Sequence, residues 1–208
     1  MKFKEINFNL LKKKPLLIVI SGPSGVGKDS VVRTLKQQEQ TLHFVVTANT
    51  RKPRVDEVEG VDYFFVSRKR FKEMIENNEL IEWAHVYDDF KGVPKARVEE
   101  AFESSKDVLM RLDVQGAEKI RKLYPEAVLI FLLPDSEEEW YRRIEAREGG
   151  RPKDLGQRIE AIQKELKMTS LFDYLVVNAD GKLQETVDTI VAIINTEHQR
   201  TIPRSIKP

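Results

Sequence analysis

The feature that most constrains this chain is an apolar run, Leu16–Ile20, that leads directly into the glycine-rich turn Gly22–Lys28. This order is typical of a buried strand that ends in a phosphate-binding P-loop, where glycines let backbone N–H groups approach phosphate oxygens. The lysine would reach the terminal phosphates as a point charge. Apolar residues at helical spacing follow, which predicts a helix whose positive N-terminal end faces the anion. We therefore expect a nucleotide-phosphate site formed by Gly22, Pro23, Ser24, Gly25, Val26, Gly27, Lys28, Asp29 and Ser30.

One residue of this turn departs from the strict P-loop pattern, which requires Ser or Thr directly after the lysine. The chain has Asp29 there, followed by Ser30. A carboxylate at this position can coordinate Mg²⁺ directly or through water, and its charge suits the start of a helix. The alternative to a phosphate site is an ordinary glycine turn between a strand and a helix.

Composition indicates a compact protein with a core of its own. The 208 residues suffice for one domain, and 35 Lys and Arg residues balance 34 Asp and Glu residues, so nothing indicates binding to nucleic acid or to a membrane. Without cysteine there is no disulfide, thiolate metal site or cysteine nucleophile. The chain also lacks a secretory signal and an apolar run of about 20 residues. We expect a cytoplasmic location and a monomer or homodimer.

Short apolar runs alternate with amphipathic stretches along most of the chain. Such alternation predicts an α/β fold in which helices cover both faces of a parallel sheet. The domain would span residues 16–195, between a lysine-rich tail, 1–15, and a C-terminal tail, 196–208. The expected strands are Leu16–Ile20, Phe44–Thr47, Val108–Leu112, Val128–Leu132 and Tyr174–Val177. The expected helices are Ser30–Gln37, Gln115–Leu123, Ser136–Arg147, Leu155–Met168 and Leu183–Ile194.

Two segments interrupt this alternation. Residues 48–92 are polar and rich in aromatics, with strand-like stretches at Val61–Val66 and Leu80–Val86 and a short helix around Phe71. Residues 147–155 have the glycine, proline and charge content of a mobile loop. Both segments should lie over the carboxyl edge of the sheet, where open α/β folds bind ligands. A nucleotide kinase has this organisation, with a floor for the donor triphosphate, an inserted lobe for the acceptor and a lid.

Four stretches carry a more specific signal: Thr47–Arg54, Gly60–Val66, Leu80–Ala84 and Leu112–Gly116. Together with the P-loop and the later arginines, in this order and spacing, they resemble the guanylate kinases over residues 16–194. The resemblance implies a P-loop nucleoside monophosphate kinase fold, with a parallel five-stranded core sheet flanked by helices, an inserted GMP-binding lobe and a lid. It also implies transfer of the γ-phosphoryl group of ATP to GMP, with Mg²⁺ as cofactor and the two nucleotides as partners.

The resemblance also implies how the acceptor is recognised. Glu82 corresponds to the carboxylate that accepts hydrogen bonds from guanine N1–H and the 2-amino group, which adenine cannot match because its N1 is an acceptor. Thr47 corresponds to a hydroxyl that donates to guanine O6. Guanidinium groups would clamp the GMP phosphate, because their geometry suits an oxyanion. The residues implied to bind GMP are Thr47, Arg51, Arg54, Tyr63, Glu82, Lys91, Gly92 and Asp113.

On the donor side, the resemblance implies that Arg143 and Asn178 contact ATP and that lid arginines lean on the triphosphate when the lid closes. Asp29 and Asp113 are the implied metal-binding residues. Phosphoryl transfer needs alignment of two phosphates and positive charge at the transferring group rather than a general base. The residues implied to act in the transfer are Lys28, Arg54, Arg147 and Arg158.

Simpler roles stay open for several of these side chains. Arg51 and Arg54 could be solvated on a loop. Glu82 could be a surface charge on an edge strand, and Asp113 could cap a helix.

Other positions depart from the common guanylate kinase pattern and resemble divergent forms that include those of plant organelles. Lys91 replaces a tyrosine and could contact phosphate through its charge, whereas Val93 cannot hydrogen-bond guanine. Arg111 occupies a position that often holds a second aspartate, and it could pair with Asp29 or with the phosphates. Asn49 stands in place of a usual threonine.

Two rival functions remain open at this level. A ribose 1,5-bisphosphate phosphokinase resembles the chain at Gly27–Ser30. It would not need a guanine site, and so would not explain the joint presence of Thr47, Arg54, Tyr63 and Glu82. A non-catalytic guanylate-kinase-like binding module has typically lost the P-loop lysine and the lid arginines, which this chain retains.

Overall fold

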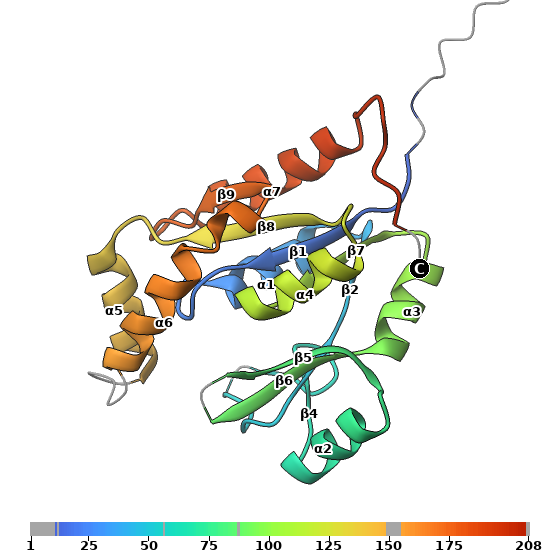
Figure 1. Cartoon of the computed structure of the whole chain (residues 1–208). Helices are drawn as coiled ribbons and strands as arrows, with labels where there is room; N and C mark the ends of the chain where they lie inside the picture. The colour runs from blue at the N-terminus through green and yellow to red at the C-terminus, as the bar shows by residue number, and fades with distance from the viewer. Residues whose placement is uncertain (1–10, 12, 56, 87, 149–154, 207–208) are drawn as a thin grey trace, which may run out of the picture.

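A computed structural model describes residues 11, 13–55, 57–86, 88–148 and 155–206 of the 208-residue chain. The expected lid, 147–155, falls mostly outside these described residues. Within them, the strands form a five-stranded sheet and a four-stranded sheet, and the second lies below the first in Figure 1.

The five-stranded core sheet is parallel throughout, as the alternation of strands and helices predicts. All residues of its central strand are buried, because both faces of the sheet are covered. The predicted fold class is therefore confirmed. In spatial order the strands are β2 (Leu42–Phe44), β7 (Asp107–Arg111), β1 (Leu17–Ser21), β8 (Val128–Leu133) and β9 (Tyr174–Val177).

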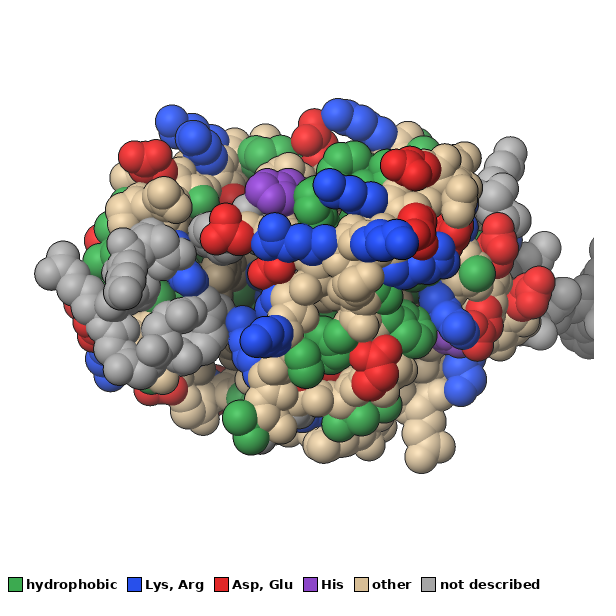
Figure 2. Space-filling view, turned by 90° about the horizontal axis from the view of Figure 1, so that it is seen from below, with side chains coloured by type: hydrophobic (Ala, Val, Ile, Leu, Met, Phe, Trp, Pro, Cys, Tyr) green, Lys and Arg blue, Asp and Glu red, His purple; other side chains and the backbone are tan. Residues whose placement is uncertain are grey.

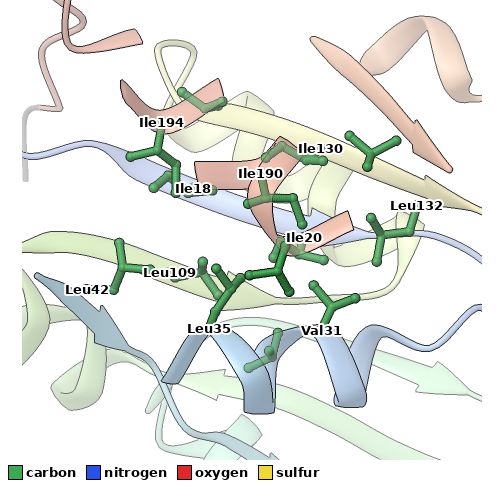
Figure 3. Close-up of a cluster of buried hydrophobic side chains, with 14 of the residues drawn as sticks. Ile18, Ile20, Val31, Leu35, Leu42, Leu109, Ile130, Leu132, Ile190 and Ile194 are labelled. Atoms are coloured by element: carbon green, nitrogen blue, oxygen red, sulfur yellow. The ribbon is translucent and has the colours of Figure 1, made fainter. Parts of the chain in front are cut away.

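Alternate residues of β1 point to opposite faces of the core sheet. Ile18 and Ile20 cluster with Leu35 and Ile190, which come from two helices on one face of the sheet (Figure 3), while Val19 belongs to a separate cluster with Val98 and Ile120. No helix in the described ranges is long and apolar enough to cross a membrane. The helices are α1 (Lys28–Gln38), α2 (Arg68–Glu76), α3 (Lys95–Glu103), α4 (Val114–Leu123), α5 (Glu137–Glu148), α6 (Leu155–Leu166) and α7 (Leu183–Glu197), with a 3₁₀ turn at Thr169–Leu171.

The four-stranded sheet is built from the polar, aromatic-rich segment of the chain. It has a small core of its own, in which Ala48, Phe71, Met74 and Leu80 are buried together under α2. In spatial order its strands are β4 (Tyr63–Phe65), β3 (Thr47–Asn49), β6 (Asp89–Pro94) and β5 (Leu80–Val86).

Three elements differ from the sequence-based expectation. The run Phe44–Thr47, predicted as one strand, is divided between the two sheets: the N–H of Val45 still bonds to Leu109 of β7 at 3.0 Å, and β3 then begins in the second sheet. The sequence does not predict β6, because this strand is polar and contains glycine and proline. It also leaves out α3, although Val98 and Ala101 are buried at helical spacing.

A buried ion-pair cluster fixes the described end of the chain to α7. Arg204 donates from Nε to Glu197 Oε2 at 2.8 Å and from Nη2 to Glu197 Oε1 at 2.9 Å. The Tyr174 hydroxyl donates to the same Oε1 at 2.7 Å. Only 1% of the Glu197 side chain is exposed, so its charge depends on these partners.

Arg204→Ala is expected to lower the free energy of unfolding by about 3 kcal/mol, because it leaves a buried carboxylate without its guanidinium. Although burial raises the pKa of Glu197, Arg204 and Tyr174 lower it overall. The stabilisation is therefore present at neutral pH and is lost as the pH falls through this lowered pKa.

Urea unfolding of the wild type and the variant at neutral and acidic pH measures the effect. Arg200→Ala is the matched control, because its Nε lies 3.7 Å from Glu197 Oε2 and 49% of its side chain is exposed. The control should lose no more than about 1 kcal/mol. Equal losses in the two variants would contradict the prediction.

Candidate active site

A cavity of about 690 Å³ opens between the carboxyl end of the core sheet and the second sheet. Parallel α/β sheets typically bind ligands at this edge. Lys and Arg side chains border a hollow on the face of the molecule shown in Figure 2. The predicted site residues that line the cavity are Gly22, Pro23, Ser24, Gly25, Gly27, Lys28, Asp29, Ser30, Thr47, Arg51, Arg54, Tyr63, Glu82, Lys91, Gly92, Asp113, Arg143 and Arg158.

The remaining predicted residues lie elsewhere. Val26 and Asn178 are buried behind the P-loop, where Asn178 Nδ2 donates to the Val26 carbonyl at 2.8 Å. Arg143 donates to the same carbonyl at 3.0 Å, so both side chains brace the loop from behind. Arg147 belongs to α5, but its side chain is outside the described part of the structure.

The P-loop backbone is one that glycine adopts without strain. Gly22 and Gly27 have φ values of +135° and +94°, and a Cβ on Gly27 would lie 2.4 Å from Asn178 Nδ2. α1 begins directly after Gly27, so its first N–H groups are available to an anion in the cavity. Lys28 Nζ donates to the carbonyls of Gly22 and, at 3.0 Å, of Pro23. Burial lowers the pKa of Lys28 to about 8.

Asp29 connects the P-loop to the second sheet. Its Oδ1 lies 2.8 Å from Arg111 Nη1 and accepts from the Tyr63 hydroxyl at 3.4 Å, while its Oδ2 lies 3.5 Å from Arg54 Nη1. Burial by itself raises the pKa of Asp29, but Arg111 and Lys28 outweigh it and hold the pKa below its ordinary value. Of the two partners expected for Arg111, the structure shows the pairing with Asp29.

Arg51 is held by an acid that the sequence analysis misses. Its Nη1 donates to Glu57 Oε2 at 2.6 Å, and its guanidinium lies 5.0 Å from the Tyr63 ring centroid. Glu57 also accepts from the backbone N–H of Arg54 at 2.8 Å. Only 16% of the Arg51 side chain is exposed, so a solvated loop does not describe it. The sequence does contain a signal for Glu57, because this acid follows Arg51 and Arg54 in the same loop.

Glu82 is a buried acid that lines the cavity from β5. Only 4% of its side chain is exposed, and its Oε2 has no hydrogen-bond partner among the described residues. The ammonium of Lys119 lies 4.0 Å away. Burial, with the nearby charge of Asp113, raises the pKa of Glu82 to about 8. A buried carboxyl group with an unpaired oxygen offers acceptors to a ligand that carries adjacent donors, and an exposed edge-strand charge does not describe it.

These elements occur together, in this order, in a known family. Residues 13–197 match the family model described as guanylate kinase. This chain belongs to the guanylate kinase family. The predicted resemblance and fold are confirmed, and the relatives include a plant organellar form.

Two relatives and one solved structure show how far the similarity extends. A guanylate kinase of Clostridioides difficile strain 630 is 42% identical over 188 residues, which cover 90% of this chain and 91% of the relative. Guanylate kinase 2, chloroplastic/mitochondrial, of Oryza sativa subsp. japonica is 41% identical over 194 residues, which cover 91% of this chain and 68% of the relative. The crystal structure of guanylate kinase from Anaplasma phagocytophilum aligns with a TM-score of 0.75 at 31% identity, covering 93% of this chain and 91% of that one.

Three acids that line this guanylate kinase cavity, Asp88, Asp89 and Glu165, were not predicted from the sequence. Glu165 follows Arg158 and Ala161 on α6 at helical spacing, and all three line the cavity. Burial raises the pKa of Glu165 to about 7, against the effect of the Lys28 ammonium. The P-loop lysine thus has a half-buried acid near it on α6.

The positions at which this guanylate kinase departs from the common pattern have distinct surroundings. Burial lowers the pKa of Lys91; the carboxylates of Asp113 and Asp29 oppose this shift, and the guanidinium groups of Arg111 and Arg51 add to it, so the ammonium lies among charges of both signs. Val93 is fully buried and pairs with Glu82 across β5 and β6. Asn49 Oδ1 accepts from the N–H of Arg51 at 3.1 Å and so shapes the loop that carries this arginine.

Two carboxylates of the cavity are placed for a divalent cation that enters with a phosphate. Asp29 and Asp113 both line the cavity, and Asp113 also caps α4 by accepting from the N–H of Gly116 at 2.8 Å. Among the described residues, no group of three or more acidic, histidine or cysteine side chains could hold a metal ion alone. Mg²⁺ is commonly bound by one or two carboxylates together with phosphate oxygens, so this donor set fits it.

Proposed function

We propose that this guanylate kinase transfers the γ-phosphoryl group of ATP to GMP and yields ADP and GDP through the residues that line the cavity. The observation that carries the proposal is one cavity that contains both a P-loop and the buried carboxyl group of Glu82, whose Oε2 has no hydrogen-bond partner among the described residues. In the reaction, an oxygen of the GMP phosphate forms a bond to the γ-phosphorus. The bond from the γ-phosphorus to the bridging oxygen breaks, and this oxygen leaves with ADP.

The donor triphosphate would lie on the P-loop. The N–H groups at the start of α1 would bind its phosphate oxygens, and Lys28 would move from the carbonyls of Gly22 and Pro23 to the terminal phosphates. Arg158 lines the cavity from α6 and would place positive charge at the transferring group. Arg143 and Arg147 of α5 would add positive charge on the donor side, and Asn178 would act by bracing the loop.

The acceptor would lie on the second sheet. Glu82 would accept from guanine N1–H and the 2-amino group, and Thr47, which is buried in the same cavity, would donate to O6. Adenine has an acceptor at N1 instead of a donor, so its N1 would face the Glu82 carboxylate without a hydrogen bond, and AMP would bind poorly. The GMP phosphate would meet Arg54, Tyr63 and Lys91, with Arg51 and Gly92 beside them.

Asp29 and Asp113 would hold Mg²⁺ with the donor phosphates. The ion would neutralise charge on the β- and γ-phosphate oxygens. The protein residues align the two phosphates and exclude water, as phosphoryl transfer requires.

A coupled assay of ADP formation with different acceptors tests the proposal. GMP should be the best substrate, with AMP, CMP and ribose 1,5-bisphosphate far slower. Faster turnover of ribose 1,5-bisphosphate would identify a sugar-phosphate kinase instead, and binding of GMP without turnover would identify a binding module.

A cytoplasmic location and a monomeric or homodimeric assembly remain predictions from the sequence. Light scattering after size-exclusion chromatography would decide the assembly state.

GMP binding is expected to release a proton from Glu82 near neutral pH. Because the pKa of Glu82 in the empty cavity is about 8, its carboxyl group is mainly protonated at pH 7. The two guanine donors require the carboxylate, so binding lowers this pKa, and the affinity rises with pH until it levels off above about pH 8. Calorimetry in buffers of different ionisation enthalpy measures the released proton.

Glu82→Gln is the control for this experiment, because it removes the titrating group and leaves the GMP phosphate unchanged. Proton release that is the same in the variant and the wild type would assign the proton to another group.

A further inference from the structure

The carboxylate of Asp29 lies where donors from three separate segments converge. Arg54 comes from the loop after β3, Tyr63 from β4 and Arg111 from the end of β7. Their distances to the Asp29 oxygens are 3.5 Å, 3.4 Å and 2.8 Å. Two guanidinium groups and a phenol around one carboxylate form an oxyanion site, because a phosphate accepts the same donors in the same geometry.

Arg111 is the most firmly fixed of these donors. Its side chain is 10% exposed, and its guanidinium lies 4.2 Å from the Tyr63 ring centroid. Its Nη2 donates to the carbonyl of Asp62 at 2.8 Å, while Nη1 faces Asp29 and the cavity. Its buried Nε has no hydrogen-bond partner among the described residues. The guanidinium is therefore anchored on one side and offers charge on the other.

Arg54 and Tyr63 are the residues that the proposed function assigns to the GMP phosphate. A phosphate that takes these two donors must lie at, or directly beside, the position of the Asp29 carboxylate. Arg111 is nearer to that carboxylate than either of them. Two anions at this position would repel each other, so the phosphate has to displace the carboxylate from its partners.

We propose, on the basis of this proposed function, that Arg111 is a third phosphate-binding residue of the acceptor site and that Asp29 occupies this site until GMP displaces it. The carboxylate keeps Arg54 and Arg111 in place in the empty enzyme and competes with the incoming phosphate. Displacement leaves Asp29 free to turn to the donor side of the cavity, where the P-loop holds ATP.

Binding of GMP and of guanosine, measured by calorimetry without ATP or metal, tests this assignment. Arg111→Met should weaken GMP binding about 10- to 100-fold, as expected for one charged hydrogen bond. Guanosine binding should not change, because guanosine has no phosphate. Arg111→Lys should bind GMP with intermediate affinity, because it restores the charge without the planar fork. Asp29→Asn should tighten GMP binding about 3- to 10-fold, because it removes the competing anion.

The opposite signs of the two partners separate this assignment from a structural ion pair. If Asp29→Asn weakens GMP binding as Arg111→Met does, the pair is structural and the assignment is wrong. If Arg111→Met weakens GMP and guanosine equally, the effect is on folding or on the base site, and the assignment is also overturned. Should Arg111→Met fail to fold, the comparison of Arg111→Lys with Asp29→Asn decides by the same signs. A wild type that does not bind GMP would contradict the proposed function itself.

Discussion

Lys28→Met is expected to lower kcat for GDP formation about 100- to 1,000-fold, the range found when one preorganised electrostatic group is removed from a transition state. Lys28 is the half-buried cation of the P-loop turn, and its ammonium donates to the backbone carbonyls of Gly22 and Pro23. These neutral contacts can be exchanged for phosphate oxygens. Methionine keeps the length of the side chain without the charge, so the turn should fold as before.

Steady-state kinetics with varied ATP and varied GMP measures this effect. The KM for GMP should change little, because the lysine lies on the donor side of the cavity. Lys182→Met is the matched control: its Nζ lies 3.1 Å from Glu185 Oε2 at the surface, and 58% of its side chain is exposed. A Lys28→Met enzyme with more than a tenth of wild-type turnover would show that the P-loop lysine does not serve the transfer.

The parts of the fold that the sequence predicts are those in which local pattern and tertiary environment agree. β1 and β8 are apolar runs that become inner strands of the core sheet with all residues buried except Leu133, so composition alone identifies them. The run Phe44–Thr47 misleads because an extended apolar segment does not reveal with which sheet it pairs, and here it crosses from one to the other. β6 is stabilised by pairing with β3 and β5 rather than by a strand propensity of its own residues. Its polar sequence therefore gives no sign of the strand.

The candidate site divides in the same way. Residues such as Lys28 and Glu82 belong to sequence motifs and could be predicted from them, and in the structure they line one cavity. Glu165 has no motif, and only the helical spacing from Arg158 could have indicated it. The sequence raised the pairing of Arg111 with Asp29 as one of two alternatives. Only the structure shows that Tyr63 and Arg54 also contact the Asp29 carboxylate, because these residues and Arg111 come from three segments that are far apart in the sequence.

Glu82→Gln is expected to lower kcat/KM for GMP about 100- to 1,000-fold, because it removes the charge from two hydrogen bonds to the base. The rate with AMP should change far less, so the preference for GMP narrows. The Glu82 carboxyl group is buried, its Oε2 has no hydrogen-bond partner within the described part of the chain, and its pKa of about 8 keeps it largely neutral at pH 7. An amide of the same shape should therefore leave the stability of the empty enzyme unchanged.

This separation of stability from specificity is what makes the substitution informative. Replacing a buried structural carboxylate such as Glu197 by glutamine would lower the free energy of unfolding of the protein. Replacing a carboxyl group that serves a ligand would lower only the affinity for that ligand. Glu79→Gln is the matched control, since this acid pairs with Arg70 at 2.6 Å outside the cavity. Thermal melts and competition between GMP and AMP measure the two effects separately. Glu82 and Thr47 line the same cavity, and Glu82 Oε2 has no hydrogen-bond partner among the described residues. If the preference for GMP over AMP is unchanged in Glu82→Gln, this carboxyl group does not recognise guanine.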